Sequence, residues 1–174
     1  MAFVRIKKVK GKEYGYLVEN KWKKGKIRTA KGVKQKVKAY PGRVYVLQKT
    51  DEKEFWETIN SEPESYLKMA TKEKILHDLI RFELMRHGFV NQGEIWKKED
   101  VQVDIKKKRV TGCSGAGCVL KLNEGHLYSQ RIRKLYSYEA NGEIEEVGPE
   151  LAKLFIESGI GVPQEVFIAY YEKL

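Results

Sequence analysis

The sequence predicts an α+β fold in which a small basic antiparallel β-meander precedes a mixed helix and strand domain. Three observations predict it. Residues 2–48 alternate apolar and basic side chains and are interrupted by glycine, as the strands of a meander are. Apolar residues then recur at helical spacing within residues 64–87, and residues 93–122 return to strand-like alternation. Strands and helices that gather in separate runs are typical of α+β folds.

The N-terminal meander is expected to contain strands at residues 2–9, 13–19, 33–40 and 43–47. In the third of them, Val33, Gln35, Val37 and Ala39 share one face and lysines occupy the other. Gly-containing turns separate the strands at Lys10-Gly11-Lys12, Lys24-Gly25-Lys26 and Lys31-Gly32. Pro41-Gly42 is expected to end the third strand.

The pattern changes near residues 48–51, and this change predicts two domains, a basic β module at residues 1–48 and an α+β domain at 50–174. Thr50 or Asp51 is expected to N-cap a short helix around Phe55 and Trp56. A longer helix over residues 64–87, interrupted near 69–71, should follow.

The C-terminal half is expected to continue with strands, turns and three helices. Lys106-Lys107-Lys108 predicts a turn. Asn123 is expected to N-cap a helix that reaches Tyr138, while Gly148-Pro149 and Val162-Pro163 are expected to start two more. The last helix carries Phe167, Tyr170 and Tyr171, which serve either the core or a contact in a homodimer.

Composition indicates a soluble chain of one domain or two small ones. The 174 residues are 41% hydrophobic, enough for a core, and no apolar run approaches the roughly 18 residues that would span a bilayer. The start, MAFVRIKKVKGK, lacks the apolar region of a signal peptide, so we expect a cytoplasmic protein without membrane contact. Lys and Glu dominate the charged residues, a trend typical of thermophile proteins.

Charge is distributed very unevenly along the chain. The first 49 residues carry sixteen Lys and Arg against two acidic residues, a net +14, whereas the remaining 125 residues have a net charge of −4. Clustered cations that neutralise phosphates supply most non-specific nucleic-acid affinity. The expected phosphate contacts are Arg5, Lys7, Lys8, Lys10, Lys12, Lys23, Lys24, Lys26, Arg28, Lys36, Lys38 and Arg43.

The same residues also have a purely structural interpretation that does not involve nucleic acid. Exposed lysines keep a protein soluble and prevent sheet edges from pairing with one another. Tyr14, Tyr16 and Trp22 are interpreted as ordinary residues of a sheet core. Because Arg is rare among these cations, backbone contacts are favoured over the reading of base edges.

Part of this segment resembles a known family. The runs KEYGYLVEN (12–20), GKIR (25–28), KQKVKAY (34–40) and GRV (42–44) are similar to the N-terminal segment of many insertion-sequence transposases of the DDE type. Residues 29–33 are inserted relative to that pattern, and Pro41 stands at a Leu-like position. The resemblance covers about residues 1–45 and implies DNA contact. Residues 50–174 resemble uncharacterised archaeal proteins.

No catalytic motif is found in the remainder. A transposase core needs three metal-binding carboxylates, but Asp occurs only at 51, 78, 100 and 104, and no strand carries a convincing metal ligand. His77, Asp78 and Arg81 are interpreted as a solvated helix face. We therefore expect no catalytic residue, no metal and no cofactor.

Cys113 and Cys118 enclose a Ser-Gly-Ala-Gly loop. A four-residue hairpin loop would place them as a cross-strand pair within reach of a disulfide, although two buried thiols fit the pattern equally well. A third alternative is an enzyme that uses one of these cysteines with His126.

The function that the sequence favours is non-enzymatic nucleic-acid binding, with DNA favoured over RNA. The alternative is a protein-interaction module whose basic face docks an acidic partner. Salt-dependent DNA binding would support the first, and a partner that is retained after nuclease treatment would support the second.

Overall fold

The computed structural model describes residues 2–22, 33–140 and 144–174. Within them the fold is α+β, with a five-stranded sheet of order β1-β2-β3-β8-β9 and a four-stranded sheet of order β4-β5-β6-β7. The strands are β1 (Ala2–Val9), β2 (Lys12–Trp22), β3 (Val33–Val46), β4 (Val90–Gln92), β5 (Ile95–Lys98), β6 (Val101–Asp104), β7 (Arg109–Gly112), β8 (Cys118–Leu122) and β9 (Gly125–Leu127). The helices are α1 (Phe55–Thr58), α2 (Pro63–Met69), α3 (Lys72–Arg86), α4 (Ser129–Tyr136), α5 (Ile144–Ser158) and α6 (Gln164–Tyr171).

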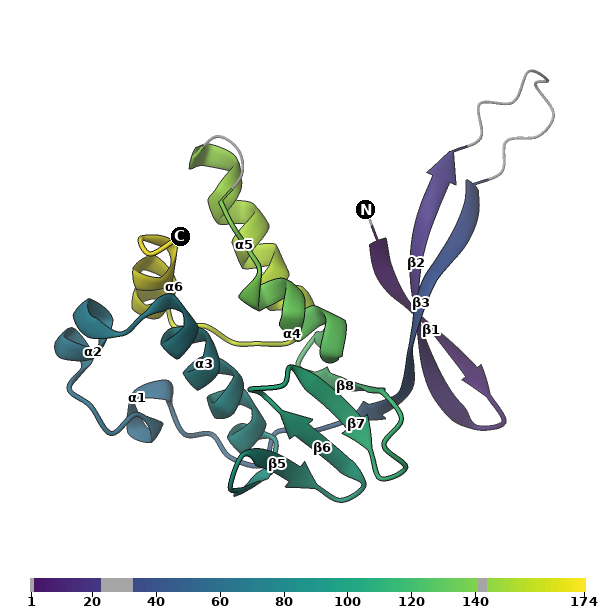
Figure 1. Cartoon of the computed structure of the whole chain (residues 1–174), viewed down its shortest axis with the longest axis horizontal. Helices are drawn as coiled ribbons and strands as arrows, with labels where there is room; N and C mark the ends of the chain where they lie inside the picture. Colours follow the sequence, from purple (N-terminus) through teal and green to yellow (C-terminus); the bar gives the residue numbers. More distant parts are fainter. Residues whose placement is uncertain (1, 23–32, 141–143) are drawn as a thin grey trace.

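Strands β1, β2 and β3 form an antiparallel arm that projects from the rest of the molecule, here called the body (Figure 1). The turn predicted at Lys10-Gly11 is confirmed, because both residues have positive φ (48° and 78°), as tight hairpin turns require. The turns predicted at Lys24-Gly25-Lys26 and Lys31-Gly32 lie outside the described residues.

The arm and the body share one sheet. The last part of β3, from Arg43 to Val46, pairs in parallel with β8. Pro41-Gly42 therefore does not end the third strand as expected. Instead β3 runs through Gly42, whose φ of +117° only glycine adopts without strain. Strand β3 ends at Val46 and α1 begins at Phe55, so β3 joins the body's sheet before residues 48–51. The division into two domains at that point stays a prediction.

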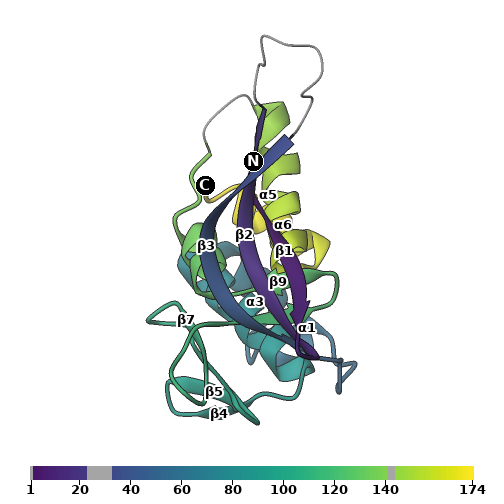
Figure 2. The same cartoon turned by 90° about the vertical axis from the view of Figure 1, so that its right-hand side faces the viewer.

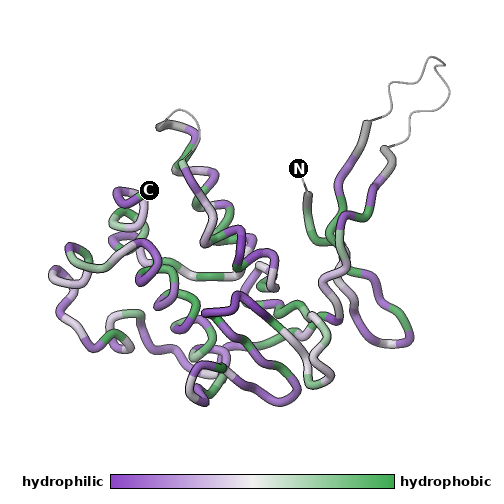
Figure 3. The backbone as a smooth tube through the Cα atoms, viewed as in Figure 1, coloured by the Kyte–Doolittle hydropathy of each residue, from purple (hydrophilic) through white to green (hydrophobic). Residues whose placement is uncertain are grey.

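One face of the arm packs against the body. Val4 and Ile6 contact a small buried cluster of Val44, Val119 and Tyr128. We call this side the inner face and the opposite side the outer face. In Figure 2 the three strands lie side by side in front of the helices, and the tube in Figure 3 alternates between hydrophilic and hydrophobic residues along them.

The main core lies in the body. It joins α3 to strands of both sheets and to helices α4 to α6 through fully buried side chains. Leu79 and Ile80 of α3, Val103 of β6, Leu135 of α4 and Tyr170 of α6 are all buried there. Part of the last helix's apolar face is thus core, and a homodimer contact through α6 stays a prediction.

The helix boundaries before residue 90 agree partly with expectation. Helices α2 and α3 are separate, as predicted, and the Thr71 hydroxyl accepts a hydrogen bond from the Lys74 amide at 3.2 Å to cap α3. The cap predicted for α1 is wrong, because Glu54 takes that position and forms a capping box with Glu57. The Thr50 amide instead donates to the Arg86 carbonyl at 2.7 Å, which ties the linker to the end of α3.

Two later helix starts also differ from expectation. Asn123 has φ +49° in the turn between β8 and β9, and α4 begins only at Ser129. Helix α5 starts at Ile144 and runs through Gly148-Pro149, because burial of Val147 extends its packing face towards the N-terminus. The start predicted at Val162-Pro163 is confirmed, since Pro163 is the N-cap of α6.

Candidate nucleic-acid interface

The outer face of the arm brings three tyrosines and several cations together. Strand register places Arg5 opposite Tyr16 and Lys7 opposite Tyr14, and Tyr14 is in turn opposite Arg43. Directly opposed residues point to the same side of a sheet, so these side chains share the outer face. The cluster, with Tyr40 added by its ring contacts, is called the tyrosine platform and consists of Arg5, Lys7, Tyr14, Tyr16, Tyr40 and Arg43.

The three rings contact one another. The Tyr14 and Tyr40 ring centroids are 6.3 Å apart with an angle of 28° between the ring planes, and Tyr16 and Tyr40 are 5.2 Å apart. Tyr40 has 55% of its surface exposed, whereas Tyr14 and Tyr16 are half-buried. The platform thus presents one accessible ring, Tyr40, that contacts two less exposed rings.

Each cation of the platform has a neighbour on the sheet, which for Lys7 is a platform ring, for Arg43 the ring of Tyr45 and for Arg5 a glutamine. Lys7 Nζ lies 5.3 Å from the centroid of the Tyr16 ring, and Arg43 Cζ lies 4.7 Å from that of Tyr45. Arg5 Nη1 donates a hydrogen bond to Gln35 Oε1. These three cations remain exposed, so their charges stay available to an anionic ligand.

Both acidic residues of the arm point the other way. Glu13 is opposite Lys8 and Glu19 is opposite Lys36, in the alternate positions that share the inner face with Val4 and Ile6. Glu19 also forms a 3.0 Å ion pair with Lys38. Within the described part of the arm, the outer face therefore carries positive charge without a carboxylate.

Tyr40, the exposed ring of the platform, is a neutral phenol. Partial burial, followed by the neighbouring Tyr16 and Tyr14 hydroxyls, raises the pKa of Tyr40 above its usual value. A neutral phenol ring next to Lys and Arg offers a π face and a hydroxyl donor without repelling phosphate.

The predicted phosphate-binding residues do not all gather in one place. Arg5, Lys7 and Arg43 lie in the platform, and Lys12, which pairs with Val9, extends the outer face towards the hairpin turn that contains Lys10. The remaining described lysines lie on the inner face: Lys8, Lys36 and Lys38. Four predicted residues lie outside the described residues: Lys23, Lys24, Lys26 and Arg28.

The interpretation of Tyr14 and Tyr16 as core residues is wrong. Both lie on the outer face, where Tyr40 joins them, and neither packs in a buried cluster. Their i, i+2 spacing in the sequence places them on one face. The partner strand could not be aligned from sequence, because the β2–β3 pairing contains register shifts between Gly15 and Val18.

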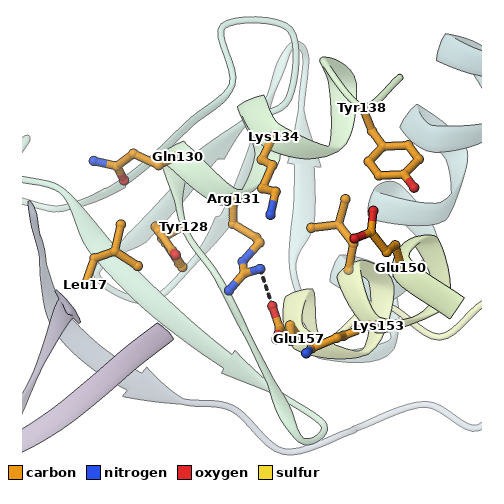
Figure 4. A pocket seen from close by; sticks show the side chains of 10 residues that line it. Leu17, Tyr128, Gln130, Arg131, Lys134, Tyr138, Glu150, Lys153 and Glu157 are labelled. Carbon is orange, nitrogen blue, oxygen red and sulfur yellow. Dashed lines mark hydrogen bonds and ion pairs between the residues drawn. The ribbon is translucent and has the colours of Figure 1, made fainter. Parts of the chain in front are cut away.

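A cleft of about 350 Å³ opens between the arm and helices α4 and α5 (Figure 4). Leu17 lines it from the inner face of the arm, and charged side chains line it from the body. Arg131, itself buried, donates to Glu157 Oε2 at 2.7 Å, and Lys153 lies on the same helix as Glu157. Opposite charges are thus mixed here, unlike on the outer face.

The two cysteines lie in and beside the loop that precedes β8. Cys113 and Cys118 are both free thiols, of which Cys113 is exposed and Cys118 is buried. The Gly112 amide donates a hydrogen bond to the Ala116 carbonyl at 2.9 Å within the loop between them. Burial raises the pKa of Cys118 to about 12. Among the described residues, no three His, Cys, Asp or Glu side chains lie close enough together to hold a metal ion.

Asp78 departs from the expected solvated helix face. It is buried and accepts a hydrogen bond from the Tyr66 hydroxyl at 2.9 Å. Burial opposes its ionisation, but the hydrogen bonds from His77, Lys74 and Tyr66 outweigh that effect and lower its pKa. Asp78 therefore anchors α3 to α2 as a buried carboxylate.

Comparison of the chain with family models, with curated proteins and with solved structures found no match. In the described part of the chain, none of the helices has the length and apolar character that crossing a bilayer demands.

Proposed function

We propose that this protein is a non-enzymatic nucleic-acid-binding protein, with DNA favoured over RNA, and that the outer face of the arm is its binding surface. The observation that carries the proposal is the tyrosine platform, in which exposed cations surround contacting tyrosine rings and no carboxylate intervenes. Cations attract phosphates, and tyrosine faces contact bases or sugars.

Charge on the scale of the whole chain supports the same surface. The first 49 residues have a net charge of +14, and the described acids among them point to the inner face. A polyanion approaching the arm is therefore steered towards its outer side. The favoured use of DNA comes from the resemblance of residues 1–45 to transposase N-terminal segments, and it belongs to this proposal.

An acidic protein partner is the second candidate. On charge alone, the basic arm would bind an acidic protein as well as it would bind a nucleic acid. A homodimer is a further proposed partner. The clustered rings favour nucleic acid, because repeated bases offer flat faces along a phosphate chain, whereas acidic protein segments are poor in such faces.

Wild-type protein should bind fluorescein-labelled DNA oligonucleotides with an affinity that falls as salt rises. Fluorescence anisotropy between 50 and 300 mM NaCl should give a linear plot of log K against log salt, with a slope of about −0.7 per phosphate contact for single strands or −0.9 for duplex. Three platform cations predict a slope of about −2 or steeper. Absence of DNA binding at 50 mM NaCl would refute the proposal, and tighter binding of a matched RNA would refute the preference for DNA.

A further inference from the structure

We infer that the arm selects single-stranded nucleic acid over duplex, with Tyr40 as the residue on which a base stacks. The inference rests on the proposed function and adds to it the class of ligand. It follows from the tyrosines rather than from the charge, because cations alone bind both forms.

The exposure and the neighbours of Tyr40 suit its ring to stacking against a flat ligand. Its ring is 55% exposed, and two half-buried neighbours, Tyr14 and Tyr16, hold it at centroid distances of 6.3 and 5.2 Å. Because the ring is already supported, little side-chain freedom is lost when a base covers it. Stacking of a base on an aromatic side chain strengthens binding by about fivefold or more, and every base has a face that can stack.

An undistorted duplex offers this ring no base face. Its bases are stacked on one another and present only their edges in the grooves, so a tyrosine on a sheet meets sugars and phosphates instead. A single strand exposes base faces to the ring. The difference in stacking therefore appears as a difference in affinity between the two forms.

The cations lie on the two strands that flank Tyr14 and Tyr16 of β2, and one of these strands, β3, also carries Tyr40. Arg5 and Lys7 come from β1, and Arg43 comes from β3, two strand spacings or about 10 Å away. A single-stranded nucleic acid with one base seated on Tyr40 would have Arg43 beside that base on β3, and its chain could cross β2 to reach Arg5 and Lys7 on β1. Arg5 already donates to Gln35, which leaves few donors aimed at base edges, so the site should discriminate strandedness more than sequence.

The experiment uses one 20-nucleotide oligonucleotide of mixed sequence, alone and annealed to its complement, and measures Kd by anisotropy at 100 mM NaCl. Wild type should bind the single strand at least about tenfold more tightly than the duplex. Tyr40→Leu should weaken single-strand binding by about five- to thirtyfold and duplex binding by less than about twofold. Tyr40→Phe keeps the ring and should restore single-strand affinity to within about threefold of wild type.

Two results would overturn the inference. Equal wild-type affinity for the two forms would end single-strand selection while leaving the proposed function intact. If Tyr40→Leu lost the same factor in affinity for the single strand and for the duplex, Tyr40 would not be the stacking residue. Circular dichroism and thermal unfolding would confirm that this variant is folded. Failure of wild type to bind either form would instead refute the proposed function itself.

Discussion

Replacement of Gly42 by alanine should lower the free energy of unfolding by about 4 kcal/mol, the sum of backbone strain and overpacking. Gly42 has φ +117°, and a Cβ atom there would lie 1.8 Å from the Gly117 carbonyl oxygen. That carbonyl belongs to the backbone directly before β8, which pairs with β3 from Arg43 onward. Neither strand can move aside without opening the junction between arm and body.

Urea denaturation followed by circular dichroism measures this effect, and Gly11→Ala is the matched control. Gly11 also has positive φ, at +78°, but nothing lies within 4 Å of a Cβ placed there. It should lose only about 1 kcal/mol from strain alone. Equal shifts in the two midpoints would contradict the close packing of β3 on the start of β8.

Glu83→Ala is expected to have the second largest effect, a loss of about 3–4 kcal/mol, because several buried donors would lose their acceptor. The fully buried Glu83 carboxylate accepts hydrogen bonds from Asn123 Nδ2 at 2.8 Å and from the Gly161 amide at 3.0 Å, and His87 Nδ1 lies 3.3 Å from it. It thereby ties α3 to the β8–β9 turn and to the loop before α6.

The control is Glu94→Ala, which removes the same charge from an exposed ion pair with Lys106. Exposed pairs contribute little, so its urea midpoint should stay close to that of wild type. Glu83→Gln keeps one acceptor oxygen and should fall between the two. A Glu83→Ala midpoint no lower than that of Glu94→Ala would contradict the buried network.

Local patterns predicted the elements that depend on local chemistry. Alternation and the Lys10-Gly11 turn placed β1 and the start of β2, and helical spacing placed α3. Pro41-Gly42 misled because the continuation of β3 depends on β8, which lies more than seventy residues later in the chain. A glycine that breaks an isolated strand is here required by the close approach of a second backbone.

Asn123 misled for a similar reason. Its type and position suit an N-cap, but its side chain is recruited by Glu83 and the Gly159 carbonyl, both distant in sequence. Asparagine tolerates the left-handed conformation found there, so the same residue satisfies a turn. Whether Asn123 caps a helix or forms a turn can be decided only when the residues that its side chain contacts in the folded chain are known.

The candidate site was predictable in charge but not in arrangement. The net charge of +14 on the first 49 residues is visible in the sequence, and it identifies the segment that contains the arm. The placement of the β3 residues relative to β2 depends on the register shifts between these two strands, which accompany the contact of Tyr40 with Tyr14 and Tyr16. Alternation within one strand carries no information about that alignment.

A comparison of two double variants tests the outer face most directly. Arg5→Gln with Lys7→Gln, and Lys8→Gln with Lys36→Gln, each remove two positive charges from the arm, from opposite faces. In anisotropy titrations with single-stranded DNA, the outer-face variant should bind about tenfold or more weakly and flatten the salt slope by about 1.4. The inner-face variant should stay within about threefold of wild type with its slope unchanged. Equal losses in both, or a greater loss from the inner face, would contradict binding through the tyrosine platform.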